Sequence, residues 1–258
     1  MTQRRPDRNQ LIVSYMFLRQ TVGWIGTLLP IVLLVGNAIS SATPRPTSMS
    51  GYYYTDMRNI FVGSLCALGV FLGAYEGYDN VDRWLTNIAG LGAIGVALFP
   101  TTPAVPHLST TQQVVGDMHL VFAAVTFIAL GLMALRFAKG GETPPGLSTI
   151  DQVRYGLGFG KPSAASPPQH DTRDNVVYHV SGITILSCVI LAAASNLLPA
   201  PVKAHWPLLF IFEAVAVFAF GVSWFVKGRT IRGIQARIRK GAPAARPAPA
   251  IRELENHR

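Results

Sequence analysis

Charged residues and cysteines are scarce in this chain of 258 residues. Only 14% of the residues are charged and two are cysteines, whereas 50% are hydrophobic. Cys66 and Cys188 both fall inside long apolar runs, which excludes a disulfide framework and a Cys-x-x-Cys metal or redox site. Such a composition is typical of a membrane protein and leaves no room for a separate soluble domain.

Six long apolar runs account for most of the hydrophobic residues. An α-helix needs roughly 20 mostly apolar residues to cross a bilayer core of about 30 Å. The runs lie at about Thr21–Ile39, Ile60–Tyr75, Leu85–Phe99, Met118–Arg136, Val176–Ala194 and Trp206–Phe225. The sequence therefore predicts an all-α, polytopic membrane protein, with a bundle of six transmembrane helices over residues 21–226.

The positive charges are distributed asymmetrically between the predicted spans. With a cytoplasmic N-terminus, 19 of the 22 Lys and Arg residues fall in cytoplasmic segments, and only Arg45, Arg58 and Lys203 fall outside. Cytoplasmic loops of membrane proteins carry such an excess of cations. We therefore expect a multi-pass protein of the cell membrane with both termini in the cytoplasm. The net charge of +9 then follows from topology, and the expected partners are membrane lipids and not nucleic acid.

Three segments outside the apolar runs complete the predicted organisation. Residues 1–20 form a basic cytoplasmic segment, and residues 137–175 form a flexible cytoplasmic loop rich in Gly, Pro and Ser. Residues 227–258 form a basic, partly disordered cytoplasmic tail. Cations just inside a final span attract anionic lipid headgroups, which is the role expected of this tail.

Ionisable and polar residues gather at the predicted outer face. Groups of this kind within or beside a span are costly, so each needs a partner or a purpose. They are Asp56, Arg58, Asn59, His107, Asp117, His119, His205 and Glu213. Asp56 and Asp117 stand at helix N-termini, where capping alone explains a carboxylate. His119 and Glu213 lie deeper, and they predict either a polar packing network or a binding site.

The outer histidines raise the hypothesis of a metal site. They are His107, His119 and His205, and with one nearby carboxylate they would suffice to hold zinc. The protein would then be a metal-dependent membrane hydrolase or lipid-modifying enzyme, with Asp56, Asp117 or Glu213 as catalytic carboxylates. The spacing is generic, however, with neither a His-Glu-x-x-His nor a His-x-x-x-His motif. We therefore expect no cofactor.

A third hypothesis uses the polar residues near the inner face. Glu76 and His179 would pair between the second and fifth spans, and together with Glu213 they would serve a small proton-linked transporter. No clear internal repeat supports transport. Asp82 is expected to be a solvated loop charge that pairs with an arginine.

Three stretches resemble a family of membrane proteins. They are SMSGYYYTDMRNIFVG at residues 48–63, YEGYD at 75–79 and DMHLVFAA at 117–124. Their order resembles an uncharacterised group of bacterial six-span integral membrane proteins. It is more distantly similar to the Frag/DRAM-type proteins, which share a Ser-x-Ser outer loop and a His-x-x-x-Ala opening of the fourth span. The resemblance implies a six-helix fold and an outward-facing site built from Ser48, Ser50, Asp56, Arg58, Asn59 and His119, without a settled activity.

The outer cluster is also consistent with a protein that binds without catalysis. Arg58, the neighbouring tyrosines and three outward helix N-termini make a rim that favours anions such as phosphate. The resulting hypothesis is an outward-facing polar cluster that binds a lipid headgroup or another anionic ligand. Its predicted residues are Ser48, Ser50, Tyr54, Asp56, Arg58, Asn59 and His119.

Overall fold

The computed structural model describes residues 8–40, 44–75, 80–138, 172–199, 202 and 206–241. Within these ranges the chain forms six α-helices and one short 3-10 helix, and no strand. The elements are α1 (Arg8–Ser40), η1 (Ser50–Tyr54), α2 (Arg58–Gly73), α3 (Asn80–Leu98), α4 (Thr110–Ala138), α6 (Thr172–Ser195) and α8 (Leu208–Gly241). Each α-helix contains most or all of one predicted apolar run, so the all-α prediction is confirmed.

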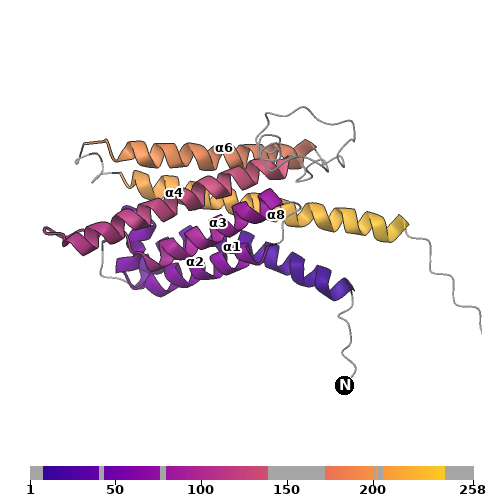
Figure 1. Cartoon of the computed structure of the whole chain (residues 1–258), viewed down its shortest axis with the longest axis horizontal. Helices are drawn as coiled ribbons and strands as arrows, with labels where there is room; N and C mark the ends of the chain where they lie inside the picture. The colour runs from indigo at the N-terminus through magenta and orange to yellow at the C-terminus, as the bar shows by residue number, and fades with distance from the viewer. Residues whose placement is uncertain are drawn as a thin grey trace, which may run out of the picture.

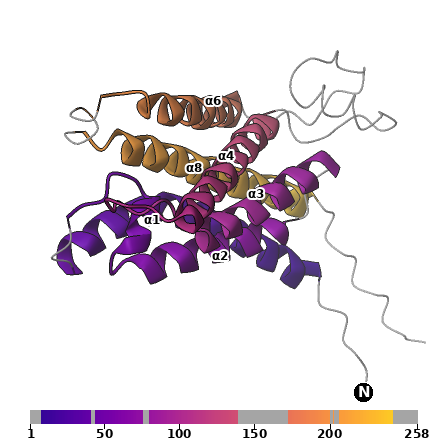
Figure 2. The same cartoon turned by 60° about the vertical axis from the view of Figure 1, so that its left-hand side comes forward.

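The six α-helices form a closed bundle. Each packs on the next along the chain, and α8 returns to pack on α1, while α4 also contacts α8. Figures 1 and 2 show the helices side by side, with the beginning of α1 and the end of α8 at the same end. We term this the terminal end of the bundle, and the opposite end, where η1 lies, the loop end. Successive helices therefore run in alternating directions.

Four of these helices are long and apolar enough to cross a membrane. They lie at Leu18–Ser40, Thr110–Ala138, Arg173–Ser195 and Leu208–Gly228. Helix α2 is apolar but has only 16 residues. The first turn of α3 contains Asp82 and Arg83, which reduces its hydrophobicity. Length and composition thus support spanning for four helices, against the six that the sequence predicts.

The outward faces of the bundle carry many exposed apolar side chains. Ile39 is 81% exposed, and Leu91 and Ile190 are each 69% exposed. Water-soluble proteins rarely leave large contiguous apolar surfaces uncovered. A bundle that is apolar both inside and outside is compatible with an integral membrane protein.

Glycines allow close approach where neighbouring helices cross. A Cβ atom added to Gly69 of α2 would lie 2.6 Å from the carbonyl oxygen of Gly90 in α3. One added to Gly221 of α8 would lie 2.8 Å from the carbonyl oxygen of Gly23 in α1. Both distances are too short for a real side chain, so these crossings require glycine. Small residues serve this purpose in membrane helix packing, where helices gain little by hiding apolar surface from one another.

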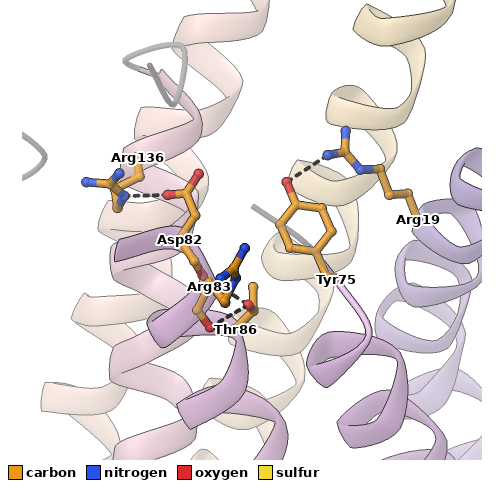
Figure 3. Close-up of polar contacts among 6 residues, drawn as sticks. All are labelled: Arg19, Tyr75, Asp82, Arg83, Thr86 and Arg136. Atoms are coloured by element: carbon orange, nitrogen blue, oxygen red, sulfur yellow. Dashed lines mark hydrogen bonds and ion pairs between the residues drawn. The ribbon is translucent and has the colours of Figure 1, made fainter. Parts of the chain in front are cut away.

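A buried ion pair joins α3 to α4 at the terminal end. The Arg136 Nε atom lies 2.6 Å from Asp82 Oδ1, and the two side chains are 5% and 1% exposed. Figure 3 shows the pair, together with the Thr86 hydroxyl, which donates to the Asp82 backbone carbonyl at 2.9 Å. The prediction that Asp82 is a solvated loop charge is therefore wrong. Asp82 lies in the first turn of α3 and is covered by the last turn of α4.

Further buried cations at the same end contact aromatic rings. The Arg19 guanidinium of α1 donates to the Tyr75 hydroxyl at 2.7 Å and lies 4.8 Å from the centre of that ring. Lys227 of α8 is 1% exposed, with its Nζ atom 5.0 Å from the centre of the Phe137 ring. Trp224 packs edge-on against Tyr75 and Phe137. A cation–π contact in which the cation is buried away from water contributes about 2 kcal/mol. These contacts therefore stabilise the packing of the helices at the terminal end.

Removing the Asp82 carboxylate should destabilise the bundle strongly. Asp82→Ala leaves Arg136 as a buried charge without this partner, and we expect a loss of about 3–5 kcal/mol in the free energy of unfolding. Denaturant unfolding of the purified protein in detergent micelles measures it. The matched control is Asp117→Ala, which removes an exposed carboxylate from α4 and should change stability by less than about 0.5 kcal/mol. Equal effects of the two substitutions would contradict a structural role for the pair.

Candidate functional site

Two long-range hydrogen bonds connect the loop between α1 and α2 to α8. The Phe210 N–H donates to the Thr47 carbonyl at 2.9 Å, and the Met49 N–H donates to Glu213 Oε2 at 2.5 Å. Phe210 and Glu213 stand in the first two turns of α8. The partner of the Glu213 carboxyl group is thus a backbone N–H of the loop.

The Ser-x-Ser sequence shapes the start of η1. Ser48 Oγ accepts a hydrogen bond from the Gly51 N–H at 3.0 Å and lies 3.2 Å from Ser50 Oγ. Serine hydroxyls often stabilise tight turns in this way. Ser48 and Ser50 are 8% and 6% exposed, so both hydroxyls lie under the loop rather than on its outer surface.

Tyr52 anchors η1 in the interior. Its side chain is fully buried and packs on the Phe210 ring, with the ring centres 5.9 Å apart. Burial raises the pKa of the Tyr52 phenol above its ordinary value, and Arg45 counteracts this in part. Tyr52 is therefore a protonated, mainly apolar anchor at neutral pH. Its hydroxyl has no hydrogen-bond partner within the described ranges.

Tyr53, Tyr54 and Arg58 form an outer surface cluster. The Tyr54 hydroxyl donates to the Thr101 carbonyl at 2.6 Å. Partial burial and the neighbouring Tyr53 raise the pKa of Tyr54, while Arg58 lowers it. The exposed Arg58 guanidinium donates to the Tyr53 hydroxyl at 2.5 Å and lies 4.2 Å from the centre of its ring. These residues tie η1 to the loop before α4 and face outward.

His119 is held inside the bundle by a backbone carbonyl. It stands in the third turn of α4, is 2% exposed, and its Nδ1 atom lies 2.6 Å from the Phe99 carbonyl oxygen. A carbonyl oxygen only accepts hydrogen bonds, so Nδ1 carries a proton. In the neutral imidazole, Nε2 is then an acceptor.

A cavity of about 60 Å³ lies between five of the helices. One water molecule needs roughly 10–15 Å³, so the cavity has room for several waters or for part of a larger ligand. Its lining includes Ser50, His119 and Glu213. Its walls are otherwise mostly apolar and extend to Leu130 of α4 and Phe220 of α8. The site is therefore an apolar chamber with polar groups at the loop end.

The cavity divides the residues that the sequence predicted as one cluster. Ser50, His119 and Glu213 line the cavity. The Ser48 hydroxyl lies within hydrogen-bonding distance of the Ser50 hydroxyl. The predicted site residues that the structure leaves exposed at the surface are Tyr54, Asp56, Arg58, Asn59 and Asp117. These residues do not form one exposed cluster, because helix rotation turns some of them inward and others outward.

Sequence reasoning missed two contributors to the cavity. Met49 offers its backbone N–H to Glu213, and a backbone donor leaves no signal in residue type. Ala123 of α4 lines the cavity, whereas the next residue, Ala124, is exposed. The signals for Ala123 were the position of His119 one turn earlier on the same helical face and the His-x-x-x-Ala pattern that the two residues form.

The predicted metal ligands do not assemble within the described ranges. No three His, Cys, Asp or Glu side chains there lie close enough to hold a metal ion. His107 is exposed and His119 is buried, and His205 lies outside the described residues. A zinc site that includes His205 therefore remains a prediction.

The residues of the transport hypothesis are only partly described. Glu76 lies outside the described residues, so its pairing with His179 stays a prediction. His179 is exposed on α6, and its Nδ1 atom lies 2.9 Å from the carbonyl oxygen of Asn175. Glu213, the third of these residues, lines the cavity.

Loss of the Glu213 carboxyl should release the loop around Met49. Removing the acceptor of a buried N–H costs about 1–3 kcal/mol, so Glu213→Ala should lower the protection of the Met49 amide from hydrogen exchange by about five- to a hundredfold. Exchange is followed by mass spectrometry of peptides covering residues 44–55. Glu213→Gln keeps an oxygen acceptor and should preserve most of the protection. Unchanged exchange in Glu213→Ala would show that the bond does not hold the loop.

No family model, no curated protein and no solved structure matches this chain. The resemblance to a bacterial six-span group and to Frag/DRAM-type proteins therefore stays a prediction.

Proposed function

We propose that all six helices span the cell membrane, with the terminal end in the cytoplasm and the loop end outside. The alternating directions of the helices, the four long apolar helices and the apolar outer faces support this topology. The excess of cations in the segments at the terminal end supports the orientation. Helices α2 and α3 then cross as shorter members of the bundle, packed against longer neighbours.

Within this topology, the proposed function is the binding of an amphiphilic lipid in the cavity. One observation supports this proposal. Three residues from distant parts of the chain meet at one end of a chamber with largely apolar walls, namely Ser50, His119 and Glu213. Binding sites for small molecules commonly combine apolar walls with a few convergent polar groups. The head of the ligand would contact these groups, and its hydrocarbon part would follow the apolar walls.

The lining of the cavity is elongated, and its volume of about 60 Å³ holds part of a lipid. Along α4 the lining extends from His119 to Leu130, which corresponds to about 16 Å of helix at 1.5 Å per residue. The exposed Tyr54, Arg58 and Asn59 lie outside the chamber. Their proposed role is contact with lipid headgroups at the outer membrane surface, as tyrosine and cations at a boundary commonly have.

Cysteine labelling in intact cells tests the proposed orientation. In a background with Cys66 and Cys188 replaced by alanine, Leu108→Cys at the loop end should react with a membrane-impermeant maleimide. Arg83→Cys at the terminal end should react only after the membrane is permeabilised. Both native side chains are exposed, which makes the two positions comparable. The reverse labelling pattern would overturn the orientation.

Filling the cavity should prevent ligand binding. The probe is a long-chain alcohol with a photoreactive diazirine in its tail, added to the protein in phosphatidylcholine vesicles. Light should attach it to α4 between His119 and Leu130, and peptide mass spectrometry locates the products. We expect Ala123→Phe to abolish this labelling, because the ring occupies the cavity.

The adjacent residue supplies a matched control. Ala124→Phe adds the same ring to the exposed face of α4 and should leave labelling of the cavity walls unchanged. Ala123→Leu fills less space and provides a second variant if the phenyl ring disturbs folding. Equal labelling of Ala123→Phe, Ala124→Phe and the native protein would overturn the proposed binding function.

A further inference from the structure

We propose that the cavity selects amphiphiles whose head group donates hydrogen bonds, a hydroxyl or a protonated amine, over amphiphiles with an anionic head. This inference rests on the proposed lipid-binding function and specifies its ligand class. It differs from the anionic headgroup that the sequence predicts for the outer cluster. The reason lies in the hydrogen-bonding capacity left at the polar end of the cavity.

His119 presents an acceptor to the cavity. Its Nδ1–H is engaged by the Phe99 carbonyl at 2.6 Å, which leaves Nε2 as the second polar atom of a ring that lines the cavity. In mostly apolar surroundings the neutral imidazole is favoured, since burying an unpaired charge is costly. A neutral ring protonated at Nδ1 accepts at Nε2 and therefore requires a donor from the ligand.

Glu213 adds a carboxyl group beside the same space. Its Oε2 atom accepts the Met49 N–H at 2.5 Å, which leaves Oε1 as the second oxygen of a side chain that lines the cavity. The same apolar surroundings favour the neutral, protonated carboxyl group while the cavity is empty. A ligand hydroxyl can donate to this group or accept from it, and a ligand ammonium would hold it as a carboxylate by pairing with it.

The charges around the cavity disfavour an anionic head. Among the described residues, its lining includes one carboxyl group, one imidazole and two hydroxyl side chains, Ser50 and Thr126, but no Lys or Arg. An anion placed there would have no compensating cation in this lining, and an unpaired buried charge is costly. Arg58 does not supply the cation, because it lies at the surface against the Tyr53 ring. The anion-favouring features of the sequence are therefore outside the chamber.

Three photoreactive probes with the same tail and different heads test this selectivity. The heads are a hydroxyl, a primary ammonium and a permanently anionic sulfonate, each presented to the full-length protein in phosphatidylcholine vesicles. In the native protein, we expect the alcohol and the amine to label the cavity walls about tenfold more than the sulfonate does, as expected for one hydrogen bond to a charged group. The glutamine in Glu213→Gln keeps an acceptor but cannot ionise to pair with the ammonium, and the substitution should reduce the preference for the amine over the sulfonate by about the same factor.

The outcomes separate this inference from the function on which it rests. Equal labelling by all three probes, or strongest labelling by the sulfonate, would overturn the head-group preference while leaving lipid binding in place, provided that Ala123→Phe still blocks it. An amine preference that persists in Glu213→Gln would exclude Glu213 as its source. Labelling that Ala123→Phe does not change, or no labelling of the cavity walls by any probe, would overturn both proposals. The comparison of the three heads needs only the native protein, so it stands even if a Glu213 variant fails to fold.

Discussion

The pairing of Asp82 with Arg136 shows the constraint on which this structure depends: an acidic or basic side chain inside an apolar bundle needs a partner within the chain. An ion removed from water loses several kcal/mol of hydration free energy, which only close and well-oriented partners can offset. At the terminal end, the carboxylate and the guanidinium meet this condition at 2.6 Å. At the loop end, backbone groups do so, since Glu213 accepts from Met49 and His119 contacts Phe99. The polar interior is therefore concentrated at the two ends of the bundle, with apolar packing between them.

The elements of the fold were largely predictable because they depend on local sequence. Apolar runs of near-spanning length form helices whatever their neighbours are, since a helix satisfies its own backbone hydrogen bonds. The burial of Asp82 was not predictable in this way. It lies at the border of a loop and a helix, and its partner is 54 positions further along the chain. Only the packing of α3 on α4 shows that the last turn of α4 covers the first turn of α3.

The candidate site shows a similar limit. The described residues that the sequence predicts at the outer face lie at one end of the bundle, but the rotation of each helix decides which of them reach the cavity. Asp117 and His119 are two positions apart on α4, which separates them by about 200° around the helix axis. One is accordingly exposed and the other is buried. The apolar periodicity of α4 is too weak to set that rotation, because its exposed and inward-facing residues are similarly hydrophobic.

The two ends of the bundle therefore differ in a way that suits a binding protein. The terminal end is stabilised by a buried ion pair, by the hydrogen bond from Arg19 to Tyr75, and by the contact of Lys227 with the Phe137 ring. The outer loop is joined to α8 through two hydrogen bonds and the packing of Tyr52 on Phe210. Ligand-binding segments are commonly drawn from the less stable parts of a protein, because they must open locally while the core stays folded. In the proposed function, a ligand would enter the cavity beneath the loop while the charged contacts at the other end keep the six helices together.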